Sequence, residues 1–141
     1  MEKYYTPAIE EFHVGFEFEE EYVGSVRGMR TWVPTKFRGD YSTNYMYENL
    51  TKHKTPRCRV KFLDKEDIES LGFEFKEGTE SSYIKDNITM HVYDAKRWNT
   101  KNDTITIFKK DLTRAVSKTI IFSGTTKNKS ELKRLLKQLE I

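Results

Sequence analysis

Much of this chain consists of short segments in which apolar and polar residues alternate. The clearest lies in the stretch EFHVGFEFEE, where Phe12, Val14, Phe16 and Phe18 are separated by polar or small residues. A period of two places the apolar set on one face, as in a half-buried β-strand. Later strand-like segments occur at 57–63, 73–75, 83–84, 88–92, 105–107 and 119–122, with a turn at Asp86–Asn87. Turn residues and no helix-length spacers separate the later ones, so we expect a mainly antiparallel, twisted sheet.

The C-terminal segment NKSELKRLLKQLEI has a different period. Leu132, Leu135, Leu136 and Leu139 follow the spacing i, i+3, i+4, i+7, which is one stripe of an amphipathic helix. Asn128, with Glu131 three residues later, resembles a capping box, and Ser130 is a rival N-cap. The stripe must be buried, and the apolar face of the sheet is the most economical place.

A second, shorter helix is predicted over residues 65–71. Asp64 can accept hydrogen bonds from the free amides of its first turn. Leu63 and Ile68 stand where a hydrophobic staple closes, and Gly72 can adopt the left-handed conformation that ends a helix. Together the elements predict one α+β domain over residues 1–141, with the C-terminal helix packed on one face of the sheet.

Length and composition narrow the class of protein. The chain has 141 residues, of which 13% are aromatic, too many for a disordered segment. The single cysteine, Cys58, excludes an internal disulfide and a multi-cysteine zinc site. No signal peptide and no long apolar run is evident, so we expect a soluble, cytoplasmic protein without a membrane partner.

The net charge of +3 hides a strong segregation of charge along the chain. Residues 1–21 and 64–80 are mainly acidic, whereas residues 22–63 and 95–141 are mainly basic. Such segregation can create a local field. Alternatively, the charges cancel in the fold if acidic and basic strands lie side by side.

Catalytic chemistry finds little support in the sequence. Cys58 alternates with Val60 and Phe62, which predicts a buried thiol rather than a nucleophile. The three histidines are isolated, so we expect no metal, no cofactor and no catalytic residue. A weaker alternative is a Mg²⁺-dependent nuclease built on Asp86 and on Asp94 with Lys96, although turn chemistry already explains both acids.

Basic and aromatic residues gather in three clusters. Cationic side chains pair with phosphates and aromatic faces stack on bases, so these clusters suit an anionic ligand if they converge in space. The competing interpretation is that the charged residues are solvated and the aromatic residues fill the core. The candidate ligand-binding residues are Arg27, Arg30, Trp32, Tyr45, Lys52, Lys54, Arg57, Arg59, Lys96, Arg97 and Trp98.

The resulting functional hypothesis is a non-enzymatic binding module. It would recognise an anionic small molecule, a nucleic acid or another protein. The alternative is a structural or protein-interaction subunit, such as a homo-oligomer, for which an exposed apolar patch is expected.

Three segments carry a resemblance: YYTPAIEEFHVGFEFE at 4–19, LDKEDIESLGF at 63–73 and NKSELKRLLKQLEI at 128–141. Together they resemble small uncharacterised proteins of gut Bacteroidetes bacteria and their phages. The resemblance implies a short cytoplasmic accessory protein, in some cases phage-encoded, that acts by binding. Its expected partner is then a host or phage protein, and in the alternative it is a virion component. The family has no established activity, so it assigns no functional residue here.

Overall fold

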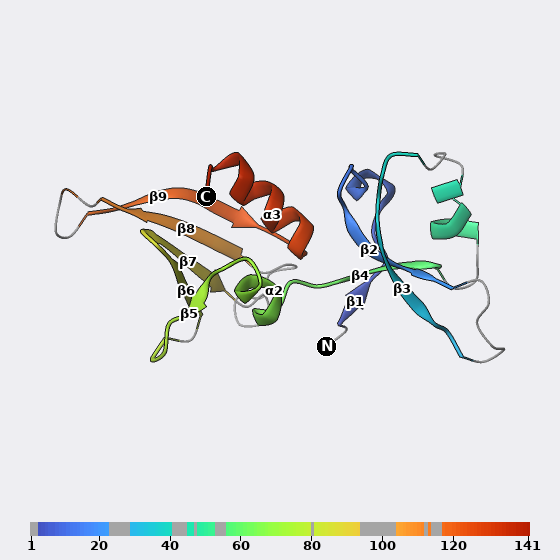
Figure 1. The fold of residues 1–141 in the computed structure, drawn as a ribbon, viewed down its shortest axis with the longest axis horizontal. Helices are drawn as coiled ribbons and strands as arrows, with labels where there is room; N and C mark the ends of the chain where they lie inside the picture. Colours follow the sequence, from blue (N-terminus) through green and yellow to red (C-terminus); the bar gives the residue numbers. More distant parts are fainter. Residues whose placement is uncertain are drawn as a thin grey trace. The chain divides into compact units, whose positions relative to one another are not determined.

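The computed structural model describes residues 3–22, 29–40, 45–46, 48–52, 56–79, 81–93, 104–111, 113 and 117–141. The chain divides into two compact units, Met1–Phe62 and Leu63–Ile141, each with its own antiparallel sheet and core (Figure 1). The α+β class and the antiparallel pairing predicted from the sequence are confirmed. The strands form two sheets where one was expected. The single domain over 1–141 stays a prediction.

The first unit contains a four-stranded sheet with the strand order β1-β4-β2-β3. A 3₁₀ turn at Ile9–Glu11 and a π-helical segment at Glu48–Lys52 lie between strands. The strands are β1 (Tyr4–Tyr5), β2 (Glu17–Glu21), β3 (Trp32–Lys36) and β4 (Cys58–Lys61).

One face of this sheet forms the first core. Phe16 is fully buried, and Phe18, Cys58 and Val60 are buried beside it, as their alternation predicts. Val14, by contrast, is 74% exposed, so its predicted place on the apolar face is wrong. The physical reason is Gly15, whose φ of +90° turns the chain immediately before β2 begins.

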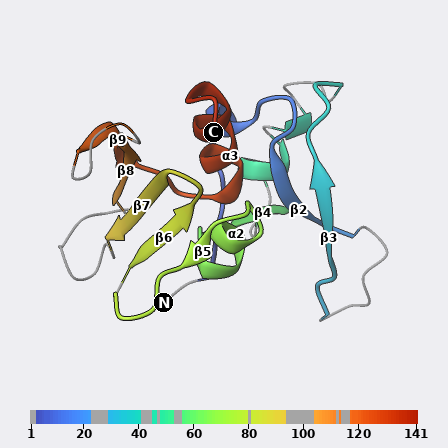
Figure 2. The same cartoon turned by 60° about the vertical axis from the view of Figure 1, so that its left-hand side comes forward.

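The second unit contains a five-stranded sheet with the order β5-β6-β7-β8-β9. Figure 2 shows these strands in succession, each turned relative to its neighbour. The strands are β5 (Glu74–Phe75), β6 (Ser82–Lys85), β7 (Ile88–Tyr93), β8 (Thr104–Lys110) and β9 (Lys118–Thr125). The described residues of this unit also form two helices, α2 (Lys65–Glu69) before β5 and α3 (Lys129–Gln138) after β9.

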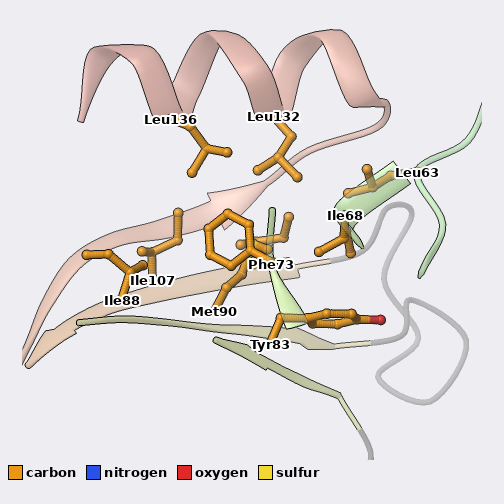
Figure 3. Packing of buried hydrophobic residues seen from close by; sticks show 10 residues of the cluster. Leu63, Ile68, Phe73, Tyr83, Ile88, Met90, Ile107, Leu132 and Leu136 are labelled. Atoms are coloured by element: carbon orange, nitrogen blue, oxygen red, sulfur yellow. The ribbon is translucent and has the colours of Figure 1, made fainter. Parts of the chain in front are cut away.

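The C-terminal helix α3 covers one face of this sheet, as the leucine stripe predicts. Leu132 is fully buried and Leu136 is 5% exposed, and both point toward Met90 and Ile107 of the sheet (Figure 3). Leu135 and Leu139 pack against the same core while remaining partly exposed. Full burial of a leucine is worth about 1.5–3 kcal/mol, so this stripe anchors the helix.

The predicted caps are present at both helices. A carboxylate oxygen of Asp64 accepts the Asp67 N–H at 3.0 Å, and Gly72 has a φ of +87° just beyond α2. α2 itself ends at Glu69, two residues earlier than expected, because the chain enters a turn there. Asn128, rather than Ser130, caps α3: its side-chain oxygen accepts the Glu131 N–H at 2.9 Å.

Candidate functional site

The candidate site is the face of the first sheet that lies opposite its core. On β2, Glu17, Glu19 and Glu21 alternate with the buried Phe18 and so project to this face. In the strand register Glu19 stands opposite Arg59 of β4, on one side of β2. An acidic strand therefore runs between two strands that carry cations. In this part of the chain, the acidic and basic segments of the sequence therefore become neighbouring strands with complementary charges.

In three ion pairs among the described residues, a glutamate of β2 neutralises a nearby cation. Arg59 Nε lies 2.5 Å from Glu19 Oε2, and Arg30 Nη2 lies 2.9 Å from Glu21 Oε2. Lys36 Nζ lies 3.8 Å from Glu17 Oε1. Arg30 also donates to the carbonyl oxygen of Pro56 at 2.7 Å, which fixes the guanidinium at two points.

The same arginines contact aromatic rings. The Arg59 guanidinium carbon lies 3.9 Å from the centroid of Tyr4 and 4.3 Å from the centroid of Trp32. The Arg30 guanidinium carbon lies 4.6 Å from the Trp32 centroid. We call Tyr4, Arg59, Trp32 and Arg30 the cation–aromatic ladder, since cations and rings follow one another in that order.

Solvent reaches the ladder only in part. The side chains of Arg59 and Arg30 are 28% and 35% exposed, and those of Glu19 and Glu21 are 26% and 22% exposed. Ion pairs and cation–π contacts in such settings are each worth roughly 0.5–1 kcal/mol. Because each arginine makes several of these contacts, its orientation is restrained, and its positive charge has a carboxylate beside it.

The ladder joins three of the residues that the sequence singled out, Arg30, Trp32 and Arg59. Sequence reasoning missed Tyr4, Glu19 and Glu21. The alternation of the glutamates with Phe18 showed that they share a face, but which strand they would meet depends on pairing across as many as 40 residues.

Two other predicted residues lie elsewhere in the first unit. The Tyr45 hydroxyl donates to Glu20 Oε1 at 2.8 Å, and Glu20 leaves β2 on the opposite face from Glu19. Arg57 directly precedes β4. Its N–H donates to the Asn49 carbonyl at 3.0 Å, and its carbonyl accepts the Glu21 N–H at 2.9 Å. These backbone bonds extend the pairing of β4 with β2.

The remaining predicted site residues cannot be placed in the ladder. Arg27, Lys54, Lys96, Arg97 and Trp98 lie outside the described residues, and so does the side chain of Lys52. The convergence that the binding hypothesis requires is therefore shown for Arg30, Trp32 and Arg59 alone.

The predicted burial of Cys58 is confirmed. It is 1% exposed, and burial, with a smaller contribution from the nearby Glu20 carboxylate, raises the pKa of its thiol to about 12. A thiol that stays protonated is a poor nucleophile.

Of the two acids in the nuclease hypothesis, only Asp86 lies within the described residues. Asp86 occupies the two-residue turn between β6 and β7 with a φ of +52°, as turn chemistry predicts. Asp94 lies outside the described residues. Within the described ranges, no group of three or more His, Cys, Asp or Glu side chains could hold a metal ion.

Both described histidines make hydrogen bonds. His13 Nδ1 lies 2.9 Å from the Glu11 carbonyl oxygen, and His91 Nδ1 lies 3.3 Å from Ser82 Oγ. Burial lowers the pKa of His91, and the positive charges of Lys118 and Lys76 lower it further.

Comparisons with protein-family models, with curated proteins and with solved structures find no significant match to this chain. Among the described residues, no helix has the length and apolar character needed to cross a membrane.

Proposed function

We propose that this protein is a non-enzymatic binding module and that the cation–aromatic ladder contacts a protein partner. The observation that carries the proposal is the position of Arg59, between the rings of Tyr4 and Trp32 and paired with Glu19. Tyrosine, tryptophan and arginine are the residues most enriched among those that dominate binding energy at protein interfaces. The ladder supplies all three in one restrained set.

The ion pairs favour a protein over a phosphate-bearing ligand. A phosphate site needs cations whose donors are available to the phosphate oxygens. Arg59 Nε and Arg30 Nη2 instead donate to Glu19 and Glu21 at 2.5 and 2.9 Å. An anion would have to displace these carboxylates or approach against their charge.

Pairing also lowers the cost of covering this face. An isolated charge that loses its water is strongly destabilising, whereas a charge with a hydrogen-bonded partner is much less so. A partner can therefore bury Trp32 and Tyr4 without leaving either arginine uncompensated. Restrained side chains also lose less conformational entropy on binding.

The test begins with affinity capture from the cells that produce the protein, followed by titration of each purified captured protein. Trp32→Ala and Arg59→Ala should each weaken the captured interaction by about 30-fold, the size expected for a dominant interface residue. The matched control is Arg134→Ala, an exposed arginine on α3, which should bind as the wild type does. Circular dichroism checks that each variant is folded.

Two outcomes would overturn the proposal. One is a partner whose affinity is the same for the ladder variants and for the wild type. The other is capture that nuclease treatment abolishes and whose affinity falls steeply with salt, since that would identify a nucleic-acid ligand.

The origin and setting of the protein remain proposals of the same kind. The resemblance of residues 4–19, 63–73 and 128–141 to proteins of gut Bacteroidetes and their phages stays a prediction, as does a cytoplasmic location. For a phage-encoded accessory protein, the expected partner of the ladder is a host protein.

A further inference from the structure

Each of the two sheets has outer strands as well as faces. The backbone N–H and C=O groups along an outer strand can pair with another chain, so proteins usually protect such edges. In the described residues, β1 and β3 are the outer strands of the first sheet, and β5 and β9 are those of the second.

Three of these strands carry common protections. β1 and β5 are only two residues long. β3 has Pro34 at its centre, which cannot donate a backbone hydrogen bond to an incoming strand. Very short edge strands and edge prolines both discourage pairing with another chain.

β9 differs from β1 and β5 in its length and from β3 in lacking a proline. It is eight residues long, contains no proline, and reads KTIIFSGT, rich in β-branched and aromatic residues that favour strands. A β-bulge near Ile121 interrupts its pairing with β8 and turns both Ile121 and Phe122 toward the core. Ile120, before the bulge, stays 59% exposed.

The pairing pattern shows which backbone groups of β9 face outward. The Asp111 N–H donates to the Ser117 carbonyl at 2.9 Å, so residue 117 bonds toward β8. Backbone groups alternate in direction along a strand, so those of Lys118 and Ile120 point to the open edge. No hydrogen bond to these groups is found among the described residues, so an incoming strand can pair with them beside the exposed Ile120.

The charge at this end of β9 indicates what the incoming strand carries. Lys118 stands directly opposite Lys110, and both are exposed. Like charges directly opposite one another destabilise a strand pair. The nearby Asp111 carboxylate accepts hydrogen bonds from Thr113, at 2.9 Å from its N–H and 2.6 Å from its hydroxyl.

We propose that the open edge of β9 accepts an extended peptide segment of a partner protein, with an apolar residue beside Ile120 and an acidic residue beside Lys118. Main-chain hydrogen bonds give such an added strand its affinity, and side-chain contacts give it specificity. β9 has no acidic residue of its own, so a second copy of β9 offers Lys118 no complementary charge.

The probe is a fluorescein-labelled octapeptide of alternating threonine and valine that ends in two glutamates. Antiparallel pairing places these glutamates beside Lys118. Fluorescence anisotropy with the full chain should give a dissociation constant below about 1 mM. A peptide ending in two lysines should bind about fivefold more weakly, in line with exposed ion pairs. N-methylation of alternate peptide amides should abolish binding without touching the protein.

A protein variant completes the test. Ile120→Pro removes an outward N–H and should lose the peptide, while Thr35→Ala on β3 should keep it. The proposal is overturned if the peptide does not bind at 1 mM, or if neither N-methylation nor the lysine ending weakens it. It is also overturned if the protein alone dimerises as its concentration rises and Ile120→Lys prevents the dimer from forming. A second copy of the chain would then occupy the edge.

Discussion

Arg59 meets Glu19 across two neighbouring strands, with Nε 2.5 Å from a carboxylate oxygen, although 40 positions separate the two residues in the chain. This pair explains much of the charge segregation in the first half of the sequence. The acidic stretch that ends at Glu21 forms the strand between two strands with cations. What remains on the surface is a set of restrained arginines and rings whose charge is largely compensated.

The contact between Trp32 and Arg59 is expected to be measurable as a coupling energy. In a double-mutant cycle of Trp32→Ala and Arg59→Ala, we expect about 0.5–1 kcal/mol of interaction free energy from urea unfolding. The control cycle pairs Trp32→Ala with Arg38→Ala, an exposed residue of the same unit beyond the far end of β3, where the two changes should add. Additivity in both cycles would show that the ring and the guanidinium do not stabilise each other.

The burial of the leucine stripe on α3 predicts that alanine substitutions at two nearby positions lower the free energy of unfolding by very different amounts. Leu132→Ala removes a fully buried side chain, so the free energy of unfolding should fall by about 2–5 kcal/mol. Arg134→Ala, on the exposed side of the same helix, should change it by less than about 0.5 kcal/mol. Thermal unfolding followed by circular dichroism measures both, and similar losses at the two sites would contradict the packing described for α3.

The buried thiol of Cys58 predicts a loss of stability at alkaline pH. Its pKa is raised from 9.0 to about 12 in the folded chain, first by burial and then by Glu20. The unfolded chain therefore releases its proton first, and stability that is fully present below pH 9 is lost as pH rises toward 12.

Between pH 8 and pH 10 this loss should be about 1.4 kcal/mol relative to Cys58→Ala, which lacks the thiol. Urea unfolding at the two pH values gives the comparison. A thiol reagent at pH 8 should react with the native protein only at the rate of unfolding. Equal pH dependence in the two proteins, or fast labelling of the native state, would show that Cys58 is accessible.

Local features of the fold could be predicted from the sequence because they depend on near neighbours. The caps at Asp64 and Asn128 and the burial of Leu132 follow from spacing within a few residues. The division into two sheets could not be predicted. Val60 packs in the first core and Leu63 in the second, and no glycine or proline lies between them.

The ladder was predictable only in its parts. The sequence shows that Arg30 stands near Trp32 and that Arg59 lies on the polar side of a strand. Their meeting depends on β2 pairing with both β3 and β4, and alternation specifies a face without naming the neighbouring strand. Glu19 and Glu21 decide how much charge the site retains, and their roles follow from the same long-range register.

Carboxylates, rather than a phosphate-bearing ligand, neutralise the arginines of the ladder. This can be tested by measuring the affinity of a fluorescein-labelled single-stranded DNA 12-mer for wild type and for Glu19→Gln, at 50 and 200 mM salt. We predict weak binding by the wild type, and severalfold tighter, more salt-dependent binding by Glu19→Gln, because the substitution releases Arg59. Tight, steeply salt-dependent binding by the wild type that Glu19→Gln leaves unchanged would contradict the claim.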